Sequence, residues 1–202
     1  MSKTPITSAK ITLKEKRSEF IGIIQPCESQ QEFSDELKKL KKEFHDASHI
    51  CWAYRLRLPK GLEELSADAG EPAGSAGLPM LNALRSADIE NGMVFVIRFF
   101  GGTKLGKRGL MDAYGGAAEQ AITAVKKAVY EHKEIYRLEC PLEYYGEVQH
   151  ALSEAGGRIL VDRSADRILW ETEVPSKGVS QLIVTLRNIT RGAAILIGEE
   201  RT

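Results

Sequence analysis

Hydrophobic and polar positions along this chain follow two different periods, so that both helices and strands are predicted. Residues 48–58 alternate in period two, which predicts a strand with one core face and one polar face. Met93–Phe99 is apolar nearly throughout, which is typical of a central strand. A capping-box pattern at Ser29 is followed by apolar residues at helical spacing, and together they predict a helix over Ser29–Glu43.

The middle of the chain is predicted to hold a loop and two further helices. Pro59–Gly77 is rich in Gly, Ala and acidic residues and predicts an irregular loop, which leads into a short helix near Leu78–Arg85. A longer helix is predicted over Leu110–Tyr130, where alanines recur on one face and allow close packing.

The pattern restarts near Ile135 and predicts a second domain. A strand, a helix, two strands, a helix and a final strand follow within about 65 residues, and this βαββαβ order is the ferredoxin-like arrangement. The short polar stretch Glu131–Glu134 is the predicted boundary. The sequence therefore predicts an α+β protein of two domains, residues 1–133 and 134–202.

Composition adds limits on location and partners. The 202 residues are 43% hydrophobic with a formal net charge of zero, but residues 1–133 carry 20 basic against 17 acidic residues, and the remainder carries 8 against 11. That mild asymmetry permits a phosphate-rich partner for the first part of the chain without requiring one. The three cysteines form no C-x-x-C pair, and no run has the length of a signal peptide core or a membrane span. A cytoplasmic protein without membrane contact is expected.

The segment Val94–Tyr114 carries the most specific chemical signal. An apolar strand runs into a glycine-rich, cationic loop and then into a helix, so that backbone N–H groups and positive charge converge where a phosphate can bind. The residues that shape and charge this loop are Gly101, Gly102, Lys104, Gly106, Lys107, Arg108 and Gly109. The alternative is a tight turn whose solvated cations bind nothing in particular.

Three other kinds of chemistry have weaker support. The spacing from Gly101 to Lys107 matches most of a nucleotide-binding P-loop, but Arg108 stands where a Ser or Thr would bind the magnesium ion. His49 and nearby residues offer zinc ligands, but their spacing does not place them on one helical face, so no metal or cofactor is expected. Asp68 and Glu71 are a possible acid/base pair, although the glycine between them and the following proline favour a structural turn.

Four strings of residues together resemble the YigZ/IMPACT family. They are SEFIG at residues 18–22, DASHICWAY at residues 46–54, DAGEPAGSAGLPML at residues 68–81 and RFFGGTKLG at residues 98–106. The resemblance is strong over residues 18–128, and it implies a ribosomal protein S5 domain 2-like fold followed by a ferredoxin-like domain. Both resemble the last two domains of elongation factor G, which act on ribosomal RNA. Eukaryotic relatives regulate translation through protein contacts.

The chain departs from the family pattern on the surface expected to bind. The resemblance implies a second acidic residue where Ala69 stands, Gly where Arg108 stands, Arg where Asp112 stands, and often Arg where Glu19 stands. Asp112 is expected in the first turn of its helix, where a carboxylate competes with an incoming phosphate. Phosphate affinity is therefore expected to be lower than in a typical relative.

These observations lead to one main functional hypothesis and two alternatives. The main hypothesis is a non-catalytic cytosolic protein that binds RNA or the ribosome, with Arg98 and the cationic glycine loop on phosphates and with His49, Asp68 and Glu71 as supports. One alternative is an enzyme acting on a small phosphorylated or peptide-like substrate through those same three supporting residues. The other is a protein-interaction adaptor that docks a protein partner on Asp68–Met80.

Overall fold

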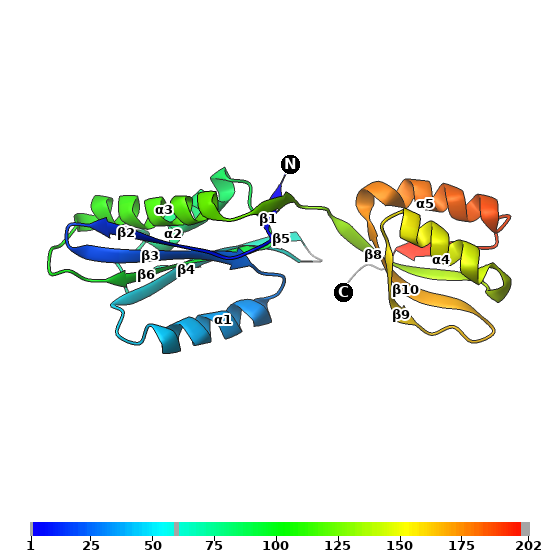
Figure 1. The fold of residues 1–202 in the computed structure, drawn as a ribbon, viewed down its shortest axis with the longest axis horizontal. Helices are drawn as coiled ribbons and strands as arrows, with labels where there is room; N and C mark the ends of the chain where they lie inside the picture. Colours follow the sequence, from blue (N-terminus) through cyan, green and yellow to red (C-terminus); the bar gives the residue numbers. More distant parts are fainter. Residues whose placement is uncertain (1, 59–60, 199–202) are drawn as a thin grey trace. The chain divides into compact units, whose positions relative to one another are not determined.

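Helices and strands are mixed in both parts of the chain, as expected for α+β (Figure 1). The structure is a computed structural model and describes residues 2–58 and 61–198. The chain divides into two compact units, Met1–Tyr130 and Glu131–Thr202. No helix in the described part of the chain is both long and apolar enough to span a bilayer.

The N-terminal unit is built on a five-stranded antiparallel sheet in the order β2-β3-β6-β4-β5. A separate two-stranded pair joins β1 to β7. The strands are β1 (Lys3–Pro5), β2 (Ala9–Glu15), β3 (Ser18–Pro26), β4 (His49–Leu58), β5 (Gly61–Ala67), β6 (Gly92–Phe99) and β7 (Lys127–Val129). The apolar strand β6 lies at the centre of the sheet, as its composition predicts.

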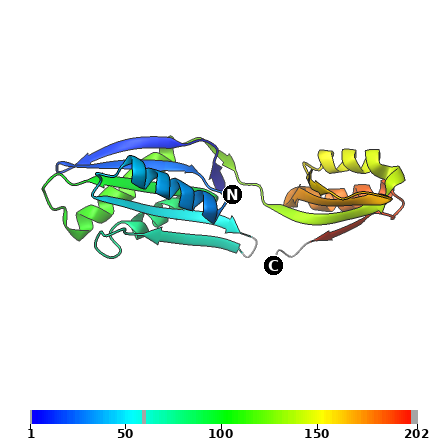
Figure 2. The ribbon, with the colours of Figure 1, turned by 90° about the horizontal axis from the view of Figure 1, so that it is seen from below.

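Helices cover both faces of this sheet. The helix α1 (Gln30–Glu43) packs on one face, and α2 (Gly77–Ser86) and α3 (Gly106–Ala124) pack on the other (Figure 1). The view from below in Figure 2 places α1 in front of the sheet. Along β6, Phe95 and Ile97 contact the α1 layer, whereas Val94 and Val96 contact the layer of α2 and α3. Strand alternation thus produces two cores.

Three expectations for this unit are corrected. The second face of β4 is not a polar face, because Cys51 and Ala53 are fully buried under α2 and α3. Within the predicted loop Pro59–Gly77, residues 61–67 form β5, and Pro59 lies outside the described residues. The third helix begins four residues early, at Gly106, and ends at Ala124, after which β7 forms.

The C-terminal unit has one antiparallel sheet in the order β11-β8-β10-β9. Its core joins Leu138 and Trp170 of the sheet to Val148 and Leu182 of the two helices, so the helices lie on one face. The elements are β8 (Lys133–Pro141), α4 (Tyr145–Glu154), β9 (Arg158–Asp162), β10 (Arg167–Pro175), α5 (Ser176–Ile189) and β11 (Ile195–Gly198), with a short 3-10 turn at Leu142–Tyr144.

Candidate nucleic-acid interface

Gly101, Gly102 and Gly106 determine the backbone path of the loop between β6 and α3. Gly101 lies directly on the backbone of the β2–β3 hairpin, where an added Cβ would come within 1.8 Å of the Arg17 carbonyl oxygen. Gly102 and Gly106 have φ values of +83° and +72°, in the left-handed region that favours glycine. Gly109 lies in the first turn of α3, and an added Cβ there would be 3.2 Å from Leu105 Cβ.

Three cations surround the start of α3. Lys104, Lys107 and Arg108 are all exposed, and the Arg108 side chain keeps 89% of its surface accessible. Among the residues that the structure describes, no side chain caps this helix. Its first N–H groups therefore face the cationic surface without a side-chain acceptor, which is the arrangement that attracts an anion.

The earlier start of α3 changes the position of Asp112. Counted from Gly106, Asp112 lies in the second turn rather than in the first. Its carboxylate pairs with Arg108 Nε at 3.3 Å, one helical turn away. Asp112 therefore neutralises part of the charge of Arg108 instead of occupying the first amides of the helix.

Two amides at the beginning of the loop are already occupied. The Phe100 N–H donates to Ser48 Oγ at 3.1 Å, and the Gly101 N–H donates to Ser18 Oγ at 3.2 Å. These hydrogen bonds tie the loop to the ends of β3 and β4. The Gly101 amide is thus structural and is already used within the protein, contrary to its expected place in a phosphate site.

Arg98, expected on phosphate, is placed inside the protein. Only 5% of the residue is exposed, and its Nη1 donates to Glu71 Oε1 at 2.6 Å. Its guanidinium lies over the rings of Phe20 and Phe100, with 5.4 Å and 5.3 Å to the centroids. Nη2 is 3.5 Å from Ser18 Oγ, and Nε has no partner among the described residues. Arg98 therefore supports the loop from below.

Glu71 is in contact with His49, another of the predicted supporting residues, and with Arg98. Its side chain is 4% exposed, and the same Oε1 that binds Arg98 accepts from the Tyr114 hydroxyl at 2.8 Å and lies 3.9 Å from His49 Nε2. Burial, followed by the neighbouring Cys51 and Glu71, raises the pKa of Tyr114, so this hydroxyl remains a donor. One carboxylate thus connects α3, β4 and β6.

Asp68 braces the turn that leads into α2. Its carboxylate accepts from the N–H groups of Gly74, Ala76 and Gly77 at 2.8–2.9 Å. Burial opposes its charge, but the three amide hydrogen bonds and the positive charge of Lys107 outweigh burial, so the pKa of Asp68 lies below its usual value. Asp68 therefore acts as the cap of α2 and fills the anion site of that helix.

The turn at residues 68–70 is closed by β4. His49 Nδ1 lies 3.0 Å from the Ala69 carbonyl oxygen, and the Cys51 thiol donates to the Asp68 carbonyl at 3.0 Å. Burial raises the pKa of Cys51 to about 12, which keeps the thiol protonated and unreactive. His49 and Cys51 thus hold the turn that positions Glu71.

Replacing Asp68 with Asn is expected to make the N-terminal unit less sensitive to acid. Because the pKa of Asp68 is lowered in the folded state, this carboxylate stabilises the fold above the ordinary aspartate pKa of about 4, and the stabilisation is lost as pH falls through the lowered value. The wild type should therefore exceed Asp68→Asn in urea midpoint near neutral pH, and the gap should close as pH falls below the ordinary aspartate pKa and through the lowered one. A gap that does not depend on pH would contradict this role.

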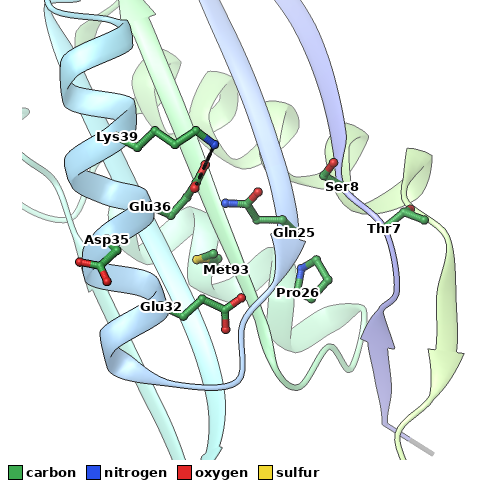
Figure 3. Close-up of a pocket in the computed structure, with 9 residues that line it drawn as sticks. All are labelled: Thr7, Ser8, Gln25, Pro26, Glu32, Asp35, Glu36, Lys39 and Met93. Carbon is green, nitrogen blue, oxygen red and sulfur yellow. Dashed lines mark hydrogen bonds and ion pairs between the residues drawn. The ribbon is translucent and has the colours of Figure 1, made fainter.

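The side chains that an enzyme would use are engaged in these structural contacts. Asp68 caps a helix, and Glu71 is bound by Arg98 and Tyr114. A pocket of about 590 Å³ lies elsewhere, on the α1 side of the sheet. Glu36 and Lys39, one turn apart on α1, form an ion pair on its wall (Figure 3). Within the described ranges, no cluster of His, Cys, Asp and Glu could hold a metal ion.

Several residues of this site were not identified from the sequence. Ser18, Ser48 and Tyr114 hold the loop and the ion pair through their hydroxyls, and Arg17 supplies the carbonyl under Gly101. Ser18 and Ser48 lie in the strings at residues 18–22 and 46–54, so the resemblance to the family was the one sequence feature that pointed to them. Tyr114 lies beyond those strings, and its role depends on the packing of α3 against the sheet, where its ring contacts Phe20 of β3.

Comparisons with known proteins place the chain in a family. The Impact N-terminal domain matches residues 16–122, more than half of the chain. The IMPACT family member YigZ of Escherichia coli (strain K12) is 28% identical over 198 residues, covering 96% of this chain and 97% of the relative. YvyE of Bacillus subtilis (strain 168) is 27% identical over 177 residues, covering 88% and 81%.

A further relative and a solved structure are also similar to this chain. An IMPACT family member of Haemophilus influenzae is 34% identical over 135 residues, covering 66% of this chain and 64% of the relative. A solved structure titled "Crystal structure of an hypothetical protein" has a TM-score of 0.79 and 25% identity, with 100% of both chains covered. The domain match contains all four strings that carry the resemblance. The chain belongs to the IMPACT family.

Proposed function

We propose that this chain is a non-catalytic cytosolic protein that binds RNA or the ribosome and thereby takes part in regulating translation. The observation that carries the proposal is the exposed cationic surface of Lys104, Lys107 and Arg108 at the uncapped start of α3. Cations on a helix N-terminus make largely sequence-independent contacts with phosphate, so specificity has to come from the shape of the RNA or from a second partner.

The buried residues support this surface rather than touch the RNA. In this proposal Arg98 and Glu71 hold the floor of the loop, and Gly101, Gly102 and Gly106 set its path. Asp68 and His49 fix the neighbouring turn, and the negative charge of Asp68 lies close enough to Lys107 to be stabilised by it. Because this scaffold is preorganised, little loop entropy is lost on binding.

We further infer the two domain types from element order. The N-terminal unit is assigned a ribosomal protein S5 domain 2-like fold, and the C-terminal unit, with strand order β11-β8-β10-β9, a ferredoxin-like fold. The domains are assigned to residues 1–133 and 134–202. The likeness of such domains to the RNA-contacting end of elongation factor G supports a ribosomal partner by analogy of fold alone.

Reversing two charges of the surface tests the proposal. Lys104→Glu with Lys107→Glu is expected to lower affinity for structured RNA by roughly tenfold or more and to flatten its salt dependence, because two phosphate contacts are lost. Both side chains are exposed, so the melting temperature should fall only slightly, through the lost attraction between Lys107 and Asp68. Fluorescence anisotropy of labelled RNA over a salt series measures affinity and slope together.

The matched control makes the same charge change elsewhere. Lys41 and Lys42 are exposed in the last turn of α1, on the opposite face of the sheet, so Lys41→Glu with Lys42→Glu should bind as the wild type does. Equal loss in both double variants would show that net charge alone is responsible. Unchanged affinity in the loop variant would remove the phosphate-contact proposal.

A protein-interaction adaptor is the second candidate. It is favoured by the exposure of the segment Asp68–Met80, where Leu78 is 47% exposed and Pro72 and Ala73 are also exposed. Pull-down from an RNase-treated lysate separates the two candidates. Partners that survive RNase and are lost in Leu78→Ser would favour the adaptor.

A further inference from the structure

Phe100 is exposed at the entrance to the cationic loop. It follows β6 directly, and 47% of its surface is accessible. The other Phe, Tyr and Trp residues that the structure describes are buried or half-buried. A single exposed aromatic side chain is ordinary, but this one lies directly beside the cationic loop, where it can contact whatever the loop binds.

The ring of Phe100 is held in a defined position. Its own N–H is bonded to Ser48 Oγ, and the next residue, Gly101, is clamped on the Arg17 backbone. The guanidinium of Arg98 lies over the ring, 5.3 Å from its centroid, and is itself fixed by Glu71. One side of the ring therefore rests on a buried cation, and its exposed area is presented to solvent.

Phe100 and the cations belong to one short segment. Lys104 lies four positions after Phe100, so even a fully extended chain places their Cα atoms within about 14 Å of each other. A flat aromatic surface next to several cations is the combination by which proteins hold unpaired nucleotides, the ring stacking on a base and the cations contacting the adjoining phosphates.

Resting on the phosphate-binding function proposed above, we infer that Phe100 is a base-stacking residue and that the site takes an unpaired nucleotide of single-stranded or looped RNA. A duplex offers phosphates to Lys104 and Lys107, but its bases are stacked inside the helix and cannot reach the ring. Arg98 acts here as a positioning residue, since it holds the ring without touching the nucleotide.

The test compares two RNAs and three variants of the full chain. The probes are a labelled single-stranded RNA of about 12 nucleotides and a blunt duplex of the same length. Phe100→Leu is expected to weaken single-strand binding by roughly 5- to 150-fold and to leave duplex binding and salt slope unchanged. The melting temperature should fall only slightly, because the contact of the ring with Arg98 is lost. Phe100→Trp should bind the single strand at least as well as the wild type. Lys104→Glu with Lys107→Glu should weaken both probes.

Each other outcome has a definite meaning. If Phe100→Leu binds the single strand like the wild type while the charge reversal weakens it, stacking is overturned and the phosphate surface stands. If Phe100→Leu weakens both probes equally, Phe100 shapes the loop and stacking is again overturned. If the wild type binds neither probe, the proposed function fails, and the stacking site fails with it.

Discussion

Glu71→Gln is expected to lower the free energy of unfolding of the N-terminal unit by about 3–5 kcal/mol. The Arg98 and Glu71 side chains are 7% and 4% exposed, and their hydrogen bond is 2.6 Å long. Removing the negative charge leaves the Arg98 guanidinium buried without compensation, between two aromatic rings that cannot replace a carboxylate. Native-state hydrogen exchange of the β6 amides measures the loss in this unit separately from the C-terminal unit.

Replacing both partners is the control. Arg98→Met combined with Glu71→Leu removes the two buried charges together, and it should lose clearly less stability than Glu71→Gln. A loss below about 1 kcal/mol in Glu71→Gln itself would contradict the buried ion pair as the support of the loop.

Gly101→Ala is expected to destabilise the same unit by about 3 kcal/mol and to displace the β2–β3 hairpin. The new Cβ would lie 1.8 Å from the Arg17 carbonyl oxygen and 2.1 Å from its carbon, and both are backbone atoms that no rotamer change can move. The thermal melt reports the stability, and amide chemical shifts of residues 15–18 report the displacement.

Gly109→Ala serves as its comparison. This position is inside α3, its nearest contact would be Leu105 Cβ at 3.2 Å, and alanine favours helix more than glycine does. The change in stability should stay within about 1 kcal/mol. Equal effects of the two substitutions would contradict the close approach of Gly101 to the hairpin.

The hydrophobic pattern was sufficient for the architecture because the two periods are clear in this chain. The central position of β6 and the helix capped by Ser29 were predicted correctly from residues alone. The burial of both faces of β4 was not predicted. Cys51, Ala53 and Arg55 form a face that looks polar in sequence, but α2 packs on it in the fold. Strand β5 was missed because its glutamates at 63 and 64 are typical of an exposed loop. In the fold they pair with Tyr54 and Arg55 of β4 and with Arg85 of α2.

The candidate site was predictable in composition but not in roles. Glycines and cations identified the loop from sequence, and positive φ at Gly102 and Gly106 agrees with that use of glycine. Whether a cation faces water or the core depends on its strand register, and Arg98 lies on the α3 side of β6 with Glu71 opposite. Sequence spacing alone cannot distinguish that ion pair from a phosphate contact.

Sedimentation with purified ribosomes and ribosomal subunits over a salt series tests the central claim most directly. We expect the wild type and Lys41→Glu/Lys42→Glu to co-sediment at low salt and to dissociate progressively as salt rises, whereas Lys104→Glu/Lys107→Glu should remain in the supernatant at salt concentrations that still retain the other two. Co-sedimentation of all three proteins with the same salt dependence would contradict the claim that the cationic loop binds phosphate.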